Sequence, residues 1–376
     1  MVAMRSRNVP ALRLEGFDGE WESCILGEHS FVTTGSSDVQ DADPDGIYPF
    51  FVRSQHVERS NKYLFNGEAI LIPGEGRLGE IFHYYVGKFD CHQRVYRISN
   101  FEDVDGKYVY WSMQHSFKDH AMQNTVKATV DSLRQPTITG FTFQKPPTLE
   151  EQQAIGAIFT NLDAAINQHT KKHQALQQAK AALMQRMFPQ EERQTVPELR
   201  LEGFDGEWES CILGEHSFVT TGSSDVQDAD PDGIYPFFVR SQHVERSNKY
   251  LFNGEAILIP GEGRLGEIFH YYVGKFDCHQ RVYRISNFED VDGKYVYWSM
   301  QHSFKDHAMQ NTVKATVDSL RQPTITGFTF QKPPTLEEQQ AIGAVFTRLD
   351  TLIAIEAKYI ESLKQAKTAL LQRMFI

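Results

Sequence analysis

A long unchanged internal repeat constrains the fold of this chain more than any other feature. Residues 12–157 recur without a substitution as residues 199–344, at a constant offset of 187 positions. A unit of 146 residues is far larger than a solenoid repeat and has the size of an ordinary globular domain. The sequence therefore predicts two domains with the same fold.

The segments that follow the repeats differ at many positions and yet keep one apolar pattern. Apolar side chains recur at alternating spacings of four and three, which is typical of helices in a coiled coil. A lone helix would expose this stripe, so we expect the two helices to pack together. The predicted seam consists of Ile155, Phe159, Leu162, Ile166, His169, His173, Leu176, Lys180, Leu183 and Met187, and of Ile342, Phe346, Leu349, Ile353, Glu356, Ile360, Leu363, Lys367, Leu370 and Met374.

Capping signals delimit the first long helix. Two prolines at 146–147 end the preceding structure. Thr148 and Glu151 have the spacing of a capping box, in which Glu151 reaches back to the N-cap amide. Pro189 ends the helix.

A whole domain must fit between the two long helices, which favours antiparallel packing with one domain near each end. The register that we predict places Ile155 against Met374 and Leu176 against Ile353. It also places His173 against Glu356, and Lys367 and Lys180 against leucines, along which their aliphatic stems can lie.

Inside each repeat, short runs of branched and aromatic residues predict strands at residues 47–52, 68–72, 80–86 and 94–98. Residues 36–46 are acidic and rich in turn formers, which indicates a loop. Residues 107–115 favour the start of a short helix. We therefore expect an α+β fold with a curved sheet.

Composition and missing motifs exclude several classes of function. No apolar run is long enough for a membrane helix, and the first ten residues do not resemble a signal peptide. The four cysteines, Cys24, Cys91, Cys211 and Cys278, are too sparse for a disulfide framework, so we expect free thiols and a cytoplasmic location. The formal net charge of −11 suggests that any DNA binding receives positive charge from partner proteins.

Local motifs for catalysis are weak or missing. The glycine motif at residues 74–79 precedes a predicted strand, whereas a dinucleotide site requires a helix there, so we interpret it as a turn. Cys91 and His92, with His83 or His115, lack the spacing of metal ligands. No nucleotide-binding P-loop and no Asn-Pro-Pro-aromatic methyltransferase motif is present. A nuclease carboxylate cluster stays an alternative without local support.

Residues 145–155, together with Leu162-Asp163, resemble the hallmark segment of type I restriction-modification specificity subunits. The same elements recur at 333–342 and at Leu349-Asp350, and residues 16–21, 48–53, 68–73 and 76–79 resemble that family's target-recognition domain. The resemblance covers nearly the whole chain. It implies a recognition domain at 1–147, a long helix at 148–188, a second recognition domain at 189–334 and a second helix at 335–376. Members of the family usually carry two different recognition domains, whereas these two are identical.

The resemblance implies a non-catalytic, pseudo-two-fold symmetric subunit that reads double-stranded DNA. Two methyltransferase subunits would bring S-adenosylmethionine, restriction subunits would bring ATP, and this chain would hold no cofactor or metal itself. Because the domains are identical, we expect an interrupted palindromic target. The alternatives are a protein scaffold that binds no DNA and a self-contained nuclease or methyltransferase.

Candidate DNA-contacting residues are basic or amide side chains that turns can present to a duplex. Arg, Gln and Asn can form paired hydrogen bonds with base edges, while Lys suits phosphates. Surface solvation is the plain alternative for each residue. The candidates are Arg53, Ser54, Gln55, His56, Arg59, Lys62, Arg77, Gln93, Arg94, Gln123, Asn124 and Lys127, with their repeats Arg240, Ser241, Gln242, His243, Arg246, Lys249, Arg264, Gln280, Arg281, Gln310, Asn311 and Lys314.

Overall fold

The computed structural model describes residues 8–124, 132–190, 194–311 and 319–376. The chain divides into two compact units, each with one repeat and parts of both long helices. Unit 1 comprises residues 1–170 and 358–376, and unit 2 comprises residues 171–357. Each unit is described on its own.

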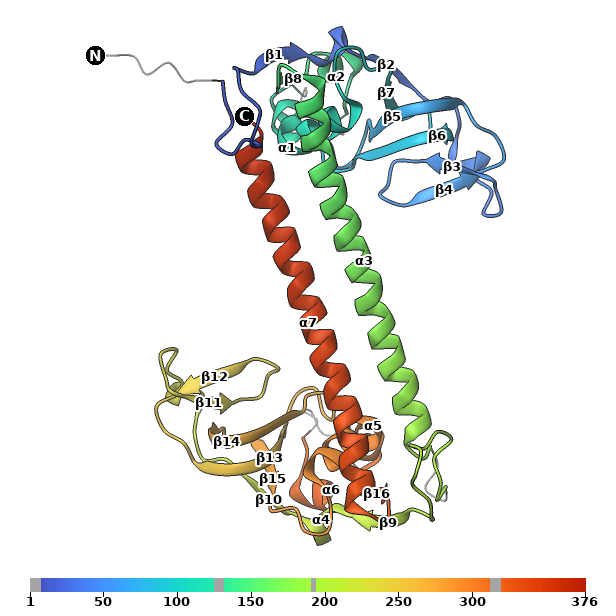
Figure 1. Ribbon diagram of the computed structural model, residues 1–376. Coiled ribbons are helices and arrows are strands. Elements are labelled where there is room, and N and C mark those ends of the chain that lie inside the picture. The colour runs from blue at the N-terminus through green and yellow to red at the C-terminus, as the bar shows by residue number, and fades with distance from the viewer. Residues whose placement is uncertain (1–7, 125–131, 191–193, 312–318) are drawn as a thin grey trace, which may run out of the picture. The chain divides into compact units, whose positions relative to one another are not determined.

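Unit 1 contains a six-stranded sheet in the order β2-β7-β5-β6-β3-β4, and only the β3–β6 pair is parallel (Figure 1). A second, two-stranded sheet pairs β1 with β8. The elements of the repeat are β1 (Glu22–Ile25), η1 (Leu26–Glu28), β2 (Phe31–Thr34), η2 (Val39–Asp41), β3 (Tyr48–Phe51), β4 (Val57–Ser60), β5 (Phe65–Pro73), β6 (His83–Cys91), β7 (Val95–Ser99), α1 (Gly106–Asn124), α2 (Gln135–Thr139) and β8 (Thr142–Lys145).

Alternate residues of strand β5 point to opposite faces of the sheet, and both of these faces are buried. Ile70 and Ile72 belong to a large core that includes α1, whereas Ala69 and Leu71 join a smaller cluster with Phe89. The six-stranded sheet therefore has an apolar core on each face. The predicted α+β class is confirmed.

All four predicted strands and the predicted helix have different bounds in the structure. The strand expected at 80–86 is β6, which begins at His83 because residues 76–80 form bends and a turn, and the short helix expected at 107–115 is the 19-residue α1. Gly79 adopts a φ of +66°, and a Cβ there would lie 2.7 Å from the Lys118 Cα. The glycine motif therefore serves a tight turn before a strand, as predicted.

Unit 2 repeats this architecture with sheets in the order β10-β15-β13-β14-β11-β12 and β16-β9. Its elements are β9 (Glu209–Ile212), α4 (Leu213–His216), β10 (Phe218–Thr221), η3 (Val226–Asp228), β11 (Tyr235–Phe238), β12 (Val244–Ser247), β13 (Phe252–Pro260), β14 (His270–Cys278), β15 (Val282–Ser286), α5 (Gly293–Asn311), α6 (Gln322–Thr326) and β16 (Thr329–Lys332).

The long helices are α3 (Leu149–Met187) and α7 (Leu336–Met374). In unit 1, Ile155 and Phe159 near the start of α3 share a core with Met374 at the end of α7. In unit 2, Met187 at the end of α3 shares a core with Ile342 near the start of α7. The helix segments within each unit are therefore antiparallel, and every predicted seam position is buried or half-buried.

Two ion pairs support the predicted register to within one residue. In unit 1, Lys367 Nζ lies 2.6 Å from Asp163 Oδ1, next to its predicted neighbour Leu162. In unit 2, Lys180 Nζ lies 2.5 Å from Asp350 Oδ1, next to Leu349. Each ammonium also lies over an indole ring of its own unit, Trp111 at 4.4 Å for Lys367 and Trp298 at 4.5 Å for Lys180. The carboxylate of Glu356, expected opposite His173, pairs with Lys172 at 2.5 Å.

The predicted capping box is confirmed only in half. The Glu151 amide donates to Thr148 Oγ1 at 3.3 Å, as an N-cap requires. The Glu151 carboxylate accepts instead from Arg13 Nε and Nη2, at 2.8 and 2.7 Å. A guanidinium forms two charge-assisted hydrogen bonds and so outcompetes a single backbone amide. The pair ties the N-terminal segment to the start of α3.

Within the described residues, no helix is long and apolar enough to cross a membrane. The division at 147, 188 and 334 into domains and helices stays a prediction.

Candidate nucleic-acid interface

Four connecting loops of unit 1 meet at one place and hold several predicted DNA-contacting residues. They are residues 35–38, 52–56, 74–77 and 92–94, which we call the loop cluster. Backbone hydrogen bonds join these loops and so fix the directions of their side chains. The bonds run from His92 N to Phe51 O (3.0 Å), Ser37 N to Cys91 O (3.3 Å), Gln93 N to Ser37 O (2.8 Å) and Gly74 N to Arg94 O (2.8 Å).

Two predicted arginines of the loop cluster share one carboxylate. Arg53 Nη1 lies 3.4 Å from Glu75 Oε2, and Arg94 Nη1 donates to Glu75 Oε1. The arginine side chains are 49% and 59% exposed, whereas Glu75 is 24% exposed. We call Arg53, Glu75 and Arg94 the Glu75 triad. Two guanidiniums and one carboxylate leave it with a net positive charge.

Further polar contacts in or beside the loop cluster involve Gln93, His83 and His92. Gln93 Nε2 donates to Asp38 Oδ2 at 2.7 Å, and a ring nitrogen of His83 lies 3.1 Å from the Ser54 carbonyl. Burial, followed by the charge of Arg53, lowers the pKa of His92. Its Nδ1 accepts from the Arg94 amide at 2.9 Å, which suits a neutral imidazole.

The structure places Arg59 and Lys62 outside the loop cluster. Arg59 donates from Nε to the Gly46 carbonyl at 2.8 Å and from Nη2 to the Ile47 carbonyl at 2.9 Å. Lys62 pairs with Asp41 at 3.1 Å. Arg59 therefore holds the acidic loop against β4. Lys62 has one exposed ion pair and is more accessible to DNA than Arg59.

Two predicted contacts lie on α1, and Arg77 lies at the edge of the loop cluster. Gln123 and Asn124 end α1, where Asn124 Nδ2 donates to the His120 carbonyl at 2.8 Å. Arg77 is exposed in the glycine turn. Ser132, which lies beyond the undescribed residues 125–131, forms a β-bridge with Glu75. Lys127 and Lys314 lie outside the described residues.

Unit 2 reproduces these contacts around a second triad, Arg240, Glu262 and Arg281. Arg240 Nη1 lies 3.3 Å from Glu262 Oε2, and Arg281 Nη1 donates to Glu262 Oε1. Corresponding contacts join Gln280 to Asp225 (2.9 Å), Lys249 to Asp228 (3.2 Å), and Arg246 to the carbonyls of Gly233 (2.9 Å) and Ile234 (2.8 Å). In unit 2, Arg264 also lies 3.9 Å from Glu267. Ser241, Gln242 and His243 continue the loop after Arg240, and Gln310 and Asn311 end α5.

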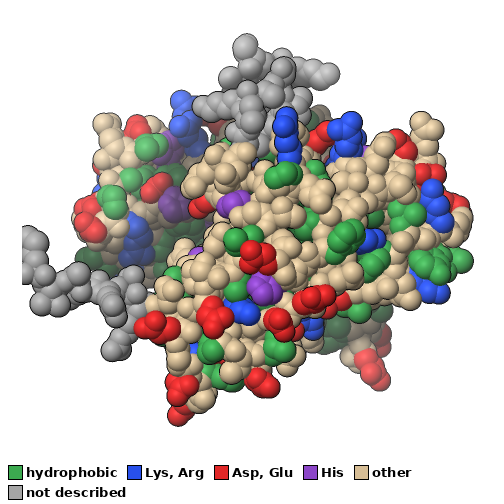
Figure 2. All heavy atoms as spheres, turned by 90° about the horizontal axis from the view of Figure 1, so that it is seen from above, with side chains coloured by type: hydrophobic (Ala, Val, Ile, Leu, Met, Phe, Trp, Pro, Cys, Tyr) green, Lys and Arg blue, Asp and Glu red, His purple; other side chains and the backbone are tan. Residues whose placement is uncertain are grey.

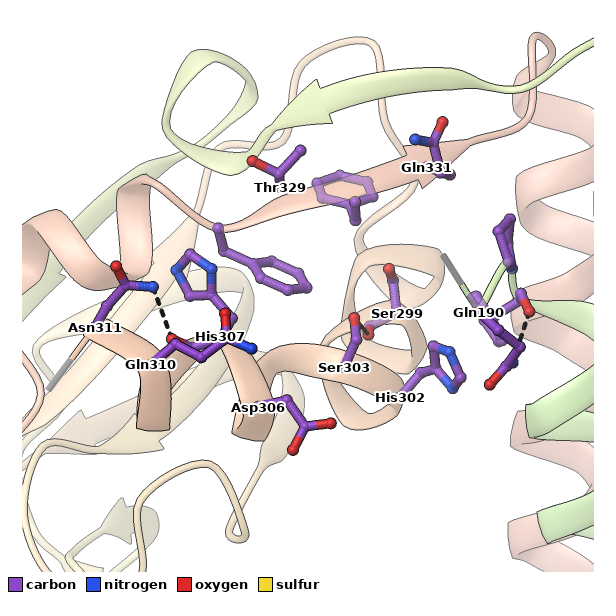
Figure 3. Close-up of a pocket in the computed structure, with 14 residues that line it drawn as sticks. Gln190, Ser299, His302, Ser303, Asp306, His307, Gln310, Asn311, Thr329 and Gln331 are labelled. Atoms are coloured by element: carbon purple, nitrogen blue, oxygen red, sulfur yellow. Dashed lines mark hydrogen bonds between the residues drawn. The ribbon is translucent and has the colours of Figure 1, made fainter. Parts of the chain in front are cut away.

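A polar hollow of about 510 Å³ in unit 2 is lined by α5, β16 and residues that follow α3 (Figure 3). Phe188 closes it by stacking on His302, with ring centroids 5.4 Å apart. Gln310 and Asn311 also line it, and Asn311 Nδ2 donates back to the His307 carbonyl at 2.8 Å. The residues that follow α3 thus form one wall of the hollow, and none of Arg240, Glu262 and Arg281 lines it.

The electrostatics suit local contacts rather than a broad basic surface. On the face drawn in Figure 2, acidic and basic side chains of the described residues are interspersed. Among the described residues, no three His, Cys, Asp or Glu side chains are grouped to hold a metal ion. All four cysteines are buried and free, and burial raises the pKa of Cys91 to about 12.

A family model described as "Type I restriction modification DNA specificity domain" matches residues 19–178 and again residues 206–365. The chain belongs to this family. The specificity subunit of the type I restriction enzyme EcoDI from Escherichia coli is 30% identical over 148 residues, which span 39% of this chain and 32% of that relative. The specificity subunit of MjaVIII from Methanocaldococcus jannaschii is 22% identical over 93% of this chain and 90% of its own length.

A solved structure supports the fold. The crystal structure of the type I restriction-modification S subunit from M. genitalium matches with a TM-score of 0.77 at 15% identity, covering 98% of this chain and 99% of that one. The family membership confirms the interpretation of the chain as a type I restriction-modification specificity protein.

Sequence reasoning missed the acidic residues of the loop cluster, Glu75 and Asp38. A usable signal was present, since Glu75 is the one acidic residue of the glycine motif at 74–79. A carboxylate in a turn beside predicted basic contacts indicates a partner for them.

Proposed function

We propose that this specificity subunit reads an interrupted double-stranded DNA site, and that each repeat reads one half of it. The observation that carries the proposal is the identity of the two repeats, which fold into two loop clusters with the same contacts. Identical readers recognise identical words. The two halves of the target therefore have the same sequence.

The two words would be inverted. Unit 1 combines the first repeat with the start of α3 and the end of α7, and unit 2 combines the second repeat with the remaining parts. Such reciprocal exchange between equivalent halves is the composition that a two-fold arrangement requires. Two-fold-related readers bind inverted half-sites, so the target would be an interrupted palindrome with half-sites about one helical turn, or 10 base pairs, apart.

Base contacts would come from the loop cluster. Arg53 and Arg94 present donors that suit guanine, and Gln93 suits adenine. Ser54, Gln55, His56 and Arg77 flank them, while Lys62 and the end of α1 would contact phosphates. The corresponding residues of unit 2 would make the same contacts with the second half-site.

Methyl transfer and cleavage would be supplied by partners. Two methyltransferase subunits would bring S-adenosylmethionine and flip the target adenine out of the duplex, and restriction subunits would bring ATP. Partners would also supply positive charge, because this chain has a net charge of −11. The complex would act in the cytoplasm.

Methylome sequencing of cells that carry this chain with its methyltransferase tests the proposal. We expect one interrupted palindrome with one modified adenine on each strand, and no such modification without this chain. A direct repeat or two unrelated words would contradict the two-fold arrangement. Methylation by the purified chain with S-adenosylmethionine alone would contradict its dependence on partners.

A further inference from the structure

We infer that Glu75, and Glu262 in unit 2, are specificity-determining residues that favour base contacts over phosphate contacts by their paired arginines. The inference rests on the proposed function, because it assumes that the loop cluster faces DNA. It assigns a role in recognition to two acidic residues that would not themselves attract DNA.

The geometry leaves one side of each guanidinium available. Arg53 and Arg94 each use Nη1 to bind Glu75, and within the described part of the chain neither guanidinium has another hydrogen bond. A guanidinium carries five N–H donors in a fixed plane. The free Nε and Nη2 donors can therefore bind the two acceptors of a guanine edge while the carboxylate keeps its own bonds.

The charge of Glu75 then distinguishes the two kinds of DNA acceptor. A phosphate bound to either arginine would bring a second negative charge beside the carboxylate, and the two would repel each other. A guanine edge offers neutral acceptors and meets no such repulsion. The carboxylate should thus weaken sequence-independent binding more than base-specific binding.

The position of Glu75 makes this effect persistent. Glu75 forms a β-bridge with Ser132. The amide of the neighbouring Gly74 donates to the Arg94 carbonyl, and the Gly74 carbonyl accepts from the Leu133 amide, each at 2.8 Å. Such a carboxylate cannot swing away from an approaching phosphate as a side chain on a free loop can. Glu80, which pairs with the exposed Lys118 at 2.6 Å, offers a control carboxylate outside the triad.

The test uses the complex of the full-length chain with its methyltransferase subunits, with Glu75→Gln and Glu262→Gln together in the chain, and a library of random DNA duplexes. Glutamine keeps the shape and one acceptor but removes the charge. We expect affinity for the unselected library to rise about fivefold to tenfold, which is the scale of a surface charge interaction in each domain. Binding should become steeper in salt, by about one phosphate per domain. Enrichment of the words that the unmodified chain selects should fall by a similar factor.

Two matched variants separate this role from a structural one. Glu75→Asp with Glu262→Asp retains the charge and should restore most of the discrimination. Glu80→Gln, compared with Glu75→Gln alone, removes the same charge from a pair with Lys118 and should leave the ratio of selected to random binding unchanged. Equal melting temperatures would show that all the variants fold.

The outcomes are distinguishable. If the complex that contains the unmodified chain enriched no words, the proposed function would fail. If it enriched words and the Glu75→Gln variant lost affinity for both DNA pools, or kept both unchanged, only the role of Glu75 would be refuted. A loss of discrimination equal to that of the Glu80→Gln control would refute it as well.

Discussion

The long helices and the loop clusters differ in what their sequences preserve. After residue 157, α3 and α7 diverge at many positions, yet every predicted seam position of both helices is buried or half-buried. The loop clusters are identical in sequence and make the same polar contacts in both units. A seam needs only side chains of suitable size and polarity, because volume-conserving changes in a core cost little. A hydrogen-bonded cluster depends on each donor and acceptor.

This contrast implies that the helices and the domains have separate roles, the helices in packing and the domains in polar contacts. The helices can change sequence while they keep their packing, and the domains can change their contacts while the packing surface stays. Substitutions at the helix contacts should therefore change stability, whereas substitutions in the loop clusters should change DNA binding.

The largest effect is expected where the end of each long helix enters a domain. Phe188 is buried in unit 2 and Phe375 in unit 1, each in contact with a tyrosine and a histidine ring. Either Phe→Ala change should lower the free energy of unfolding by about 3–5 kcal/mol, as for other buried phenylalanines. Urea unfolding measures this. Leu149→Ala, at an exposed position of α3, is the control and should stay within about 0.5 kcal/mol.

A charge on the seam should have a smaller but clear effect. Leu176→Asp places a carboxylate on the half-buried seam of unit 2 and should destabilise the protein by about 2–4 kcal/mol. Gln178→Asp makes a similar change at an exposed position of α3 and should have little effect. Equal destabilisation by both variants would show that the seam residues do not pack as described.

Periodic features of the fold, including the register of the two long helices, could be predicted from the sequence, whereas isolated polar contacts between distant residues could not. Spacing predicted the seam from Ile155 to Met187, because helical periodicity is local. The start of β6 at His83 was missed, since Ile81 and Phe82, which lie between the glycine turn and the strand, are as apolar as strand residues. The Arg13–Glu151 pair joins residues 138 positions apart, and no local pattern reports such a pairing.

The same limit applies to the candidate site. Residue type pointed to Arg53 and Arg94, but only the fold shows that one carboxylate binds both. Arg59 has the same residue type and instead holds backbone carbonyls. Basic residues alone therefore did not separate candidate contacts from structural arginines.

Arginine substitutions should separate base contact from structure. Arg53→Ala with Arg240→Ala should weaken binding to the target site that methylome sequencing identifies by about tenfold to a hundredfold, and should weaken binding to random DNA less. Competition binding against both DNA types measures the ratio. Arg59→Ala with Arg246→Ala should lower the melting temperature and leave the ratio intact. A uniform loss on both DNAs for Arg53 would assign it to phosphate contact.

The smallest effect concerns pH and reflects histidines packed against aromatic rings. Burial lowers the pKa of His115, which stacks on Phe375, and of His302, which stacks on Phe188. Below the unfolded histidine pKa of about 6.5, the unfolded chain takes up protons that the folded chain resists. The free energy of unfolding should therefore be highest above pH 6.5 and decrease as the pH falls through the lowered folded values.

Urea unfolding between pH 7.5 and pH 5 measures this slope. His115→Phe with His302→Phe should flatten it, because phenylalanine keeps a ring against Phe375 and Phe188 but takes up no proton. His56→Gln with His243→Gln changes two exposed histidines and should leave the slope as it is. A slope unaffected by the half-buried pair, or reduced equally by the exposed pair, would place the pH sensitivity elsewhere. Since the half-buried His115 and His302 stack on the phenylalanines that follow the long helices, a flattened slope would locate the pH sensitivity where those helices enter the domains.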